Sequence, residues 1–346
     1  MDLEDVNGNL LFPGAGENGY DYADMLTYAI DAEANLAAAG KPSSQIFVEE
    51  GVYYLGKNLP VWGKFTLNGV YGRTVFVCDN GNTALFKANS SNTFYENCSV
   101  TDIVFVAADA HEAFRADNTA EEIMKYVLSP KVQPVENFNC FEGMNISQSM
   151  ISNNIFSGFQ SPFAGIKGHM STHISDNTVG PCRVVLQGTH FIDCYIHDNY
   201  FFGAPVNVEG HMELPLFTTG IGPNLTMINN NYLENFYFCK PASDTYGVTY
   251  TNNTFDHVYG IEFYTANAVS NCLFTDNTYG DIAAYFESFG YEPYSAGNKG
   301  ENAYVIHAGS YNQRETDFNQ MTAGNRSYII SCAGGTAITQ CKFVEK

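Results

Sequence analysis

A four-residue phrase recurs along the middle of the chain: an apolar or aromatic residue, one variable position, Asn or Asp, and then Asn. Its final Asn stands at six positions, which are Asn154, Asn177, Asn199, Asn231, Asn253 and Asn277. Successive intervals are therefore 23, 22, 32, 22 and 24 residues. A fixed period of 20 to 50 residues indicates a repeat architecture. The single long interval indicates one repeat that carries an insertion of about ten residues.

The period of 22–24 residues predicts an all-β solenoid. No leucine ladder and no helical periodicity accompany the phrase, so a coil of short parallel strands is favoured, with each coil about 4.8 Å above the last. Asn suits a fixed corner because it tolerates left-handed backbone angles and its amide can bond the same amide on neighbouring coils. Cys98, Cys194 and Cys272 form a second column, which we interpret as an internal stack of small side chains.

The N-terminal third adds a cap to this pattern. Residues 22–39 have the spacing of an amphipathic helix, and β-rich segments follow at 46–55 and 65–70. With these features, residues 20–346 resemble the pectin-lyase-like superfamily. The resemblance implies a right-handed, single-stranded parallel β-helix whose first coil is covered by a helix at about 21–39. We expect an N-terminal extension (1–19) and one β-helix domain (20–346), with insertions at about 107–137, 210–222 and 287–304.

Charge and composition exclude several classes of partner. The chain of 346 residues has 16 Lys and Arg against 37 Asp and Glu, a net charge of −21, which disfavours contacts with nucleic-acid phosphates. No apolar run is long enough for a membrane helix. Nine Cys without a CxxC pair argue against a disulfide framework or a compact zinc site. Residues 1–19 lack a signal-peptide pattern. The expected fold by itself favours a secreted or cell-surface location, and the cytoplasm is the alternative.

Aligning the coils by inward and outward alternation predicts two polar columns on one face. The first column consists of Lys167, Gln187, Glu209, Lys240, Glu262 and Glu287. The second consists of His169, His190 and His211, each shortly after a Gly. Arg183 and Glu213 lie nearby in the chain, and Tyr291 belongs to the Gly- and Tyr-rich segment 287–304. We interpret the columns as a glycan-binding cleft; the alternative is a solvated ladder of Lys and Glu, whose exposed pairs contribute little to stability.

Cleavage or transfer of a glycosidic bond by two carboxyl groups is the favoured chemistry. Glu209 is the main candidate, with Glu262, Glu213 or Asp198 as its partner and His211 beside it. Residues 198–209 also resemble the catalytic stretch of the β-helical inulin fructotransferase family. That resemblance implies Asp198 and Glu209 as an acid/base pair acting on a fructan, completed across the interface of a homotrimer. The catalytic candidates are thus Glu209, Asp198, Glu262 and His211.

The remaining polar residues are assigned to substrate binding. They are Lys167, His169, Arg183, Gln187, His190, Glu213, Lys240, Glu287 and Tyr291. Two alternatives stay open. A polysaccharide lyase would use a basic residue for β-elimination on a uronate glycan and could need Ca²⁺, whereas glycosidic cleavage needs no cofactor and no metal. A tailspike or adhesin would bind its glycan without turnover. In each case the expected partner is a poly- or oligosaccharide.

Overall fold

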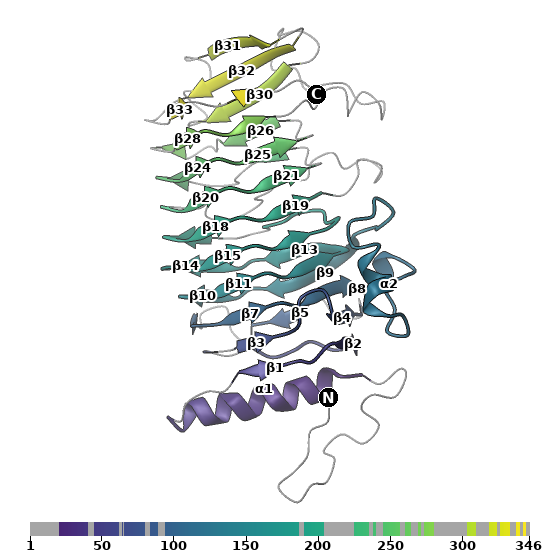
Figure 1. Ribbon diagram of the computed structural model, residues 1–346. Coiled ribbons are helices and arrows are strands. Elements are labelled where there is room, and N and C mark those ends of the chain that lie inside the picture. The colour runs from purple at the N-terminus through teal and green to yellow at the C-terminus, as the bar shows by residue number, and fades with distance from the viewer. Residues whose placement is uncertain are drawn as a thin grey trace, which may run out of the picture.

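The computed structural model describes residues 21–40, 45–61, 64, 66–79, 84–88, 94–186, 190–203, 225–234, 238–239, 245–256, 260–263, 269–270, 273–279, 303–308, 318–323, 326–332, 337–339 and 342–343. Short strands stack coil on coil into the predicted right-handed parallel β-helix (Figure 1). Within these ranges every strand pair is parallel except β31 with β32. The predicted resemblance to pectin-lyase-like proteins is therefore confirmed at the level of the fold.

Two ten-stranded sheets run the length of the stack. Sheet 1 contains β1 (Ile46–Phe47), β3 (Thr66–Asn68), β7 (Ser99–Thr101), β11 (Met150–Ser152), β15 (His173–Ser175), β18 (Tyr195–His197), β20 (Met227–Asn229), β24 (Thr249–Thr251), β28 (Leu273–Thr275) and β33 (Ala337–Thr339). Sheet 2 contains β2 (Gly51–Leu55), β4 (Thr74–Cys78), β8 (Val104–Ala107), β12 (Ile155–Ser157), β16 (Thr178–Val179), β19 (Tyr200–Phe202), β21 (Tyr232–Glu234), β25 (Thr254–Asp256), β29 (Thr278–Tyr279) and β34 (Lys342–Phe343).

Smaller sheets complete the coils. Sheet 3 contains β5 (Ala84–Lys87), β9 (Val135–Glu142) and β13 (Phe159–Ala164). Sheet 4 contains β6 (Phe94–Glu96), β10 (Asn145–Ser147), β14 (Lys167–His169) and β17 (His190–Ile192). Toward the C-terminus, one sheet contains β22 (Phe238–Cys239), β26 (Gly260–Phe263), β30 (Ala303–Ala308), β31 (Phe318–Ala323) and β32 (Arg326–Cys332). A two-stranded sheet contains β23 (Thr245–Tyr246) and β27 (Val269–Ser270).

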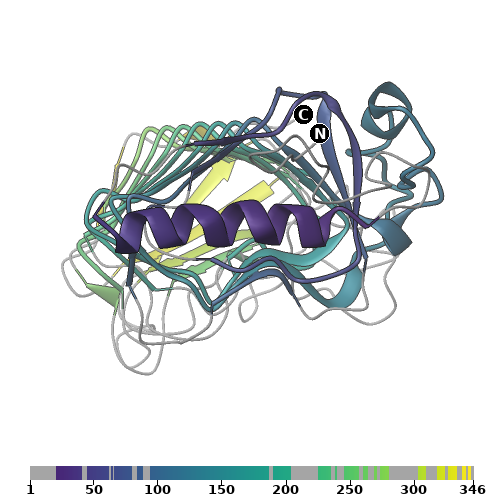
Figure 2. The same ribbon diagram turned by 90° about the horizontal axis from the view of Figure 1, so that it is seen from below.

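Helix α1 (Ala23–Ala38) covers the open end of the first coil, within the predicted range (Figure 2). Its apolar face is fully buried at Leu26 and Ile30, and Tyr22 packs edge-on against Tyr53 with ring centroids 5.0 Å apart. The Asp21 carboxylate accepts a hydrogen bond from the backbone N–H of Ala23, which caps the helix. The helix thus removes from water the apolar surface that an uncovered coil would expose.

The corner between sheets 1 and 2 is built by two consecutive residues of the repeated phrase. The first residue has a left-handed backbone, with φ between 53° and 57° at Asn153, Asp176, Asp198, Asn230, Asn252 and Asp276. The second is the buried Asn. Each buried amide donates through Nδ2 to the next Asn Oδ1, as Asn199 does to Asn231 at 2.9 Å, and also to a carbonyl of the preceding coil. The predicted ladder of Asn amides is confirmed, but the left-handed backbone angle belongs to the residue that precedes each ladder Asn.

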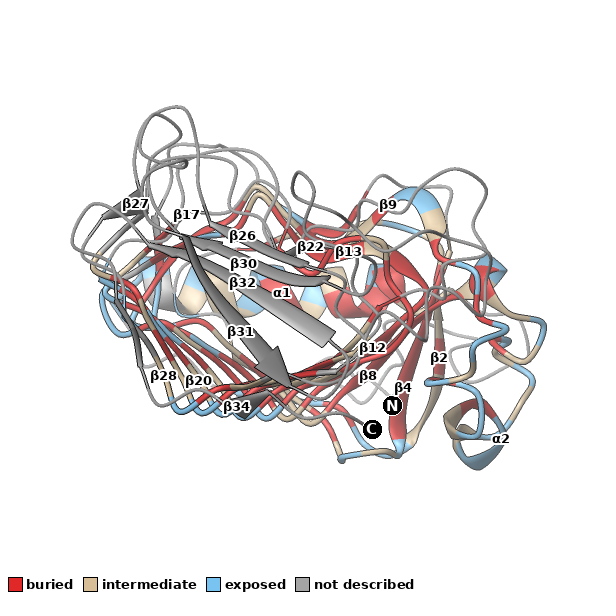
Figure 3. Ribbon diagram, turned by 90° about the horizontal axis from the view of Figure 1, so that it is seen from above, coloured by how far each residue is buried: buried red, intermediate tan, exposed pale blue. Residues whose placement is uncertain are grey.

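The interior is filled by side chains that repeat from coil to coil. Phe105 stacks on Phe156 with ring centroids 5.2 Å apart, and Phe86 stacks on Phe141 at 4.8 Å. Buried residues follow the strands, whereas exposed residues gather at the corners and around helix α2 (Figure 3). Cys98 and Cys194 are buried as predicted, and Cys272 lies outside the described residues. Such rows of large apolar side chains supply the burial that holds the coils together.

An excursion leaves the stack between β8 and β9. It contains a 3₁₀ turn (Ala108–Ala110) and helix α2 (Ala120–Met124), which stands beside sheet 2 in Figure 1. Thr119 and Glu122 form a capping box at the start of α2. The predicted insertions at 210–222 and 287–304, and the extension 1–19, lie outside the described residues.

Candidate functional site

The excursion is seated on the outer face of sheet 2. The Ser157 hydroxyl donates to the carbonyl of Val127 at 2.7 Å, and this contact fixes the excursion on strand β12. One coil higher, a Cβ atom on Gly180 would lie only 2.0 Å from the same carbonyl, so a residue without a side chain is required there. Residues 108–134 therefore cover sheet 2 as far as the coil of Gly180.

Just beyond this cover, four outward side chains form what we call the aromatic strip: Tyr200, Phe202, Tyr232 and Glu234. The strand register pairs Tyr200 with Tyr232 and Phe202 with Glu234. The two tyrosine rings have centroids 5.4 Å apart, and Tyr200 and Phe202 lie 6.4 Å apart. The Tyr200 hydroxyl donates to the Glu234 carboxylate at 2.7 Å. All four side chains are half-buried, so the strip offers ring surface and a carboxylate at the protein surface.

A hydrogen-bonded cluster lies at the corner that precedes the strip. Asp198, two residues before Tyr200, is bonded by His197 Nδ1 at 2.6 Å and by the amide of Asn230. His173 Nδ1 lies 3.2 Å from His197 Nε2, and its ring stacks on Tyr195 with centroids 4.8 Å apart. With Nδ1 of His197 donating to Asp198, Nε2 accepts from His173. Asp198, His197 and His173 thus form one chain of hydrogen bonds.

The cluster sets the charge of its members. The hydrogen bonds from His197 and Asn230 hold the pKa of Asp198 below its usual value. Partial burial, and then the neighbouring His197, lower the pKa of His173. At neutral pH Asp198 is therefore an ionised carboxylate and His173 a neutral imidazole. An ionised Asp198 can accept a proton or a substrate hydroxyl group, and it is poorly suited to donate a proton as a general acid.

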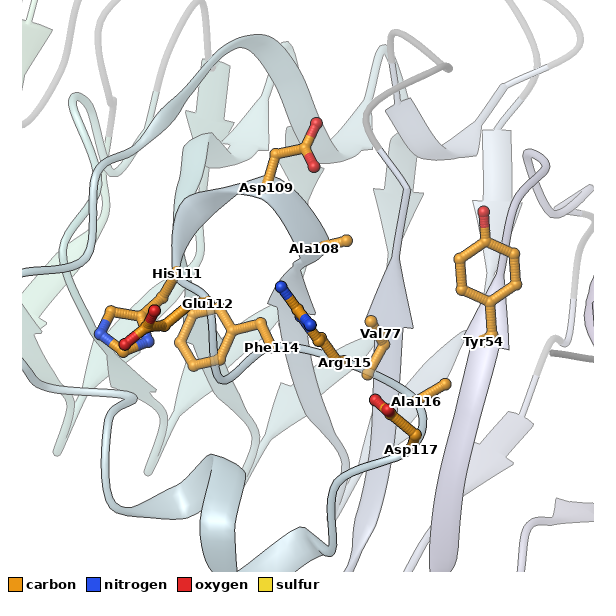
Figure 4. A pocket seen from close by; sticks show the side chains of 10 residues that line it. All are labelled: Tyr54, Val77, Ala108, Asp109, His111, Glu112, Phe114, Arg115, Ala116 and Asp117. Carbon is orange, nitrogen blue, oxygen red and sulfur yellow. The ribbon is translucent and has the colours of Figure 1, made fainter. Parts of the chain in front are cut away.

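On the other side of the excursion, a cavity of about 650 Å³ opens between Tyr54, Val77 and the segment 108–117 (Figure 4). Its charged or titratable lining residues are Asp109, His111, Glu112, Arg115 and Asp117. The Tyr54 hydroxyl donates to Asp79, and this bond, with partial burial and nearby carboxylates, raises the pKa of Tyr54 to about 12. The cavity is open and acidic, and only one cationic side chain, Arg115, lines it, so we rank it below the strip.

The predicted columns are partly wrong in register. Lys167 is exposed as predicted, and strand β14 pairs it with His190. The same register pairs His169 with Ile192, so His169 and His190 are not aligned. Alignment of the Gly-His pairs implies a step of 20 or 21 residues, whereas β14 and β17 pair with a step of 23 residues. The side-chain positions of His169 and His190 lie outside the described part.

Other predicted site residues are spread along the stack. Arg183 forms an ion pair with Glu136 at 2.8 Å, beside sheet 3. Glu262 lies on β26, opposite His307 of β30, and β22 pairs with β26 at Cys239 and Ile261. Seven predicted residues lie outside the described residues and keep their predicted roles: Gln187, Glu209, His211, Glu213, Lys240, Glu287 and Tyr291. Asp198 is the predicted catalytic residue that the described structure places in a polar cluster.

The sequence reasoning missed the aromatic strip. The signal was present, because Tyr directly follows the ladder Asn in two successive coils, at Tyr200 and Tyr232, with Phe202 and Glu234 two residues later. In a strand that starts at an inward Asn, these are the outward positions. The inward Phe201 lies between these two outward positions and is buried.

Metal and membrane sites are not supported by the described ranges. Among the described residues, no group of three or more His, Cys, Asp or Glu side chains could hold a metal ion. None of the helices in that part of the chain has the length and apolar character needed to cross a bilayer.

Comparison with known proteins finds similarity in fold only. No family model and no curated protein matches the chain. Among solved structures, the A-module of an Azotobacter vinelandii mannuronan C-5 epimerase is 13% identical over 93% of this chain and 96% of that one, with a TM-score of 0.41. PfbA, a surface adhesin of Streptococcus pneumoniae, is 10% identical over 95% and 88%, also at 0.41. A family GH82 iota-carrageenase from A. fortis is 9% identical over 95% and 88%, at 0.37.

Proposed function

We propose that this β-helix is a carbohydrate-active enzyme that binds a neutral poly- or oligosaccharide along the aromatic strip and cleaves or transfers its glycosidic bonds. The observation that carries the proposal is the pair of tyrosine rings, Tyr200 and Tyr232, on successive coils between the carboxylates of Asp198 and Glu234. A sugar ring has apolar C–H faces and a rim of hydroxyl groups. Aromatic faces with carboxylate acceptors beside them match both features.

Charge supports a neutral glycan over a polyuronate. The chain carries a net charge of −21. Both carboxylates of the site, Asp198 at the corner and Glu234 in the aromatic strip, lie at the protein surface. An anionic polymer would be repelled unless cations intervened. A neutral fructan or glucan would meet no such barrier, and its hydroxyl groups would be hydrogen-bonded by Asp198 and Glu234.

The chemistry we propose follows from the ionised state of Asp198. As a base, it removes a proton from a water molecule or a substrate hydroxyl group that attacks the anomeric carbon. His197 stabilises the orientation of the carboxylate through its 2.6 Å hydrogen bond. A second, protonated carboxyl group must donate to the leaving oxygen. We propose Glu209 for this role, as the sequence predicts, with Glu262 or Glu213 as the alternative partner.

A polysaccharide panel with product masses tests the proposal. It should include inulin, levan, pectin and alginate, with absorbance of unsaturated products followed in parallel. We expect cleavage or transfer products from a neutral glycan and no unsaturated products. An unsaturated product from pectin or alginate would instead establish elimination. Binding without turnover of any glycan would contradict the enzymatic part of the proposal and support an adhesin.

Variants separate binding from chemistry. Tyr232→Ala should weaken glycan binding about three- to tenfold, the range expected for loss of one aromatic stacking contact. Tyr71→Ala, a half-exposed tyrosine at another corner, is the matched control and should bind as the native protein does. Asp198→Asn should retain binding and lose turnover at least a hundredfold. Full turnover in Asp198→Asn would place the catalytic base elsewhere.

A further inference from the structure

The outer face of sheet 1 carries no Asp, Glu, Lys or Arg over nine successive described strands. Strand β1 contributes one outward position and each of the other eight contributes two, which makes seventeen. These positions are Phe47, Thr66, Asn68, Ser99, Thr101, Met150, Ser152, His173, Ser175, Tyr195, His197, Met227, Asn229, Thr249, Thr251, Leu273 and Thr275. Charged residues are 15% of the chain, so about two or three would be expected here by composition alone.

Four of the eight positions in one of the two columns on this face are apolar or aromatic, and the polar Thr66, Ser99, His173 and Thr249 occupy the others. Met150 is 43% exposed, Tyr195 36%, Met227 40% and Leu273 37%, and the register places all four in a single row. His173 lies in the same row, between Met150 and Tyr195, and its lowered pKa keeps it neutral at pH 7. The other column is mostly Ser, Thr and Asn. A flat uncharged face with a row of exposed apolar side chains is typical of an interaction surface.

We propose that sheet 1 is the surface through which the chain associates with a second copy of itself. Two molecules of charge −21 repel each other, and the seventeen outward strand positions of this face add no charged side chain to a contact, while the exposed carboxylates of Asp176, Asp198 and Asp276 lie at the corner beside it. A second copy presents the same face, so apolar rows and Ser/Thr columns meet like with like in an isologous contact. Met150 and Met227 have unbranched side chains, which adapt readily to such a contact.

The size of the face is sufficient for a weak specific dimer. Nine strands give eight spacings of about 4.8 Å, or about 38 Å in length. Two columns of side chains, with the reach of a side chain on either side, give a width of about 13 Å. The contact would bury about 500 Å² on each copy and about 1,000 Å² in total, at the lower end for specific interfaces. A concentration-dependent equilibrium is therefore expected.

Sedimentation equilibrium of the full chain between about 1 and 200 µM at pH 7.5 tests this proposal. We expect the mean mass to rise with concentration from one chain toward two, and Met227→Glu to raise the dissociation constant at least tenfold, because two new carboxylates meet exposed apolar side chains. Leu128→Glu, which adds the same charge at a 38% exposed leucine outside sheet 1, should associate as the native chain does. Circular dichroism confirms folding, and Met150→Glu serves as a second variant.

Three results would overturn the proposal. A native chain that stays monomeric across the whole range does not use this face for self-association. Association that is equal in the native chain, Met227→Glu and Met150→Glu takes place through another surface. Sedimentation measures self-association and not glycan turnover, and none of these variants replaces a residue of the aromatic strip or of the Asp198, His197 and His173 cluster. A limiting mass of three chains, as in the homotrimer expected from the sequence, would contradict the isologous contact, because a face that pairs with itself closes a dimer.

Discussion

Loss of one rung from the Asn ladder should destabilise the whole β-helix. In Asn177→Ala four hydrogen bonds disappear: two that Asn177 Nδ2 donates, to Ile151 O at 2.9 Å and Asn199 Oδ1 at 3.0 Å, and two that its Oδ1 accepts from the backbone and side chain of Asn154 at 3.0 and 3.2 Å. Asn177 is 1% exposed, so water cannot replace these bonds without opening the corner.

The magnitude follows from what each partner retains. Asn154 Nδ2 still donates to Val100 O, and Asn199 Oδ1 still accepts from the backbone of residue 177. The backbone N–H of Asn154 loses its acceptor, which costs about 1–3 kcal/mol for a buried donor. The three remaining bonds contribute about 0.5–1.5 kcal/mol each. The expected loss in the free energy of unfolding is therefore about 2.5–7.5 kcal/mol.

Equilibrium unfolding in urea, followed by circular dichroism, measures this loss. Asn252→Gly is the matched control: Asn252 is an exposed amide at φ 53°, where glycine is not strained, and it donates to Asn230 at the surface. We expect the control to change the free energy of unfolding by less than about 1 kcal/mol. If Asn177→Ala were no more destabilising than Asn252→Gly, the ladder would be a consequence of stacking and not a cause of stability.

Three further outcomes follow from the described residues. Because the pKa of Asp198 is lowered on folding, the ionised carboxylate stabilises the folded chain above about pH 4, and this stabilisation is lost as the pH falls through the folded pKa. Asp198→Asn should therefore lose less stability than the native chain between pH 7 and pH 3. Gly180→Ala should displace the excursion from sheet 2 and make it at least twofold more sensitive to trypsin. In His197→Gln, an NMR titration should show the pKa of His173 closer to its ordinary value.

Much of the fold could be predicted from the sequence because a parallel coil repeats its chemistry at a fixed step. The buried Asn column at Asn154 to Asn277, the helix over the first coil and the inward Cys column at Cys98 and Cys194 all follow from residues that recur at equivalent positions. The exception at the corner is instructive. Sequence reasoning gave one Asn both roles, whereas the backbone angle and the amide ladder belong to consecutive residues.

The site was harder to predict because hydrogen bonds between neighbouring strands decide which residues are paired, and a recurring sequence motif does not. The Gly-His pattern suggested that His169 and His190 are aligned, yet β14 and β17 keep the 23-residue step and pair His190 with Lys167. A slip of two residues preserves which face a side chain is on but changes its neighbours. The aromatic strip, in contrast, follows directly from the ladder, since Tyr200 and Tyr232 each come one residue after a ladder Asn.

The corner between sheets 1 and 2 has one more consequence, for how such a scaffold can diversify. From β11 onward a single left-handed residue and one buried amide join the sheets, so an added residue there would break the ladder on both sides. Extra length instead enters on the way from sheet 2 back to sheet 1, as between β8 and β9 and between β19 and β20. The corner between sheets 1 and 2 is thus kept constant, whereas the return from sheet 2 to sheet 1 can accept new loops. Loop grafting should be attempted only on that return side.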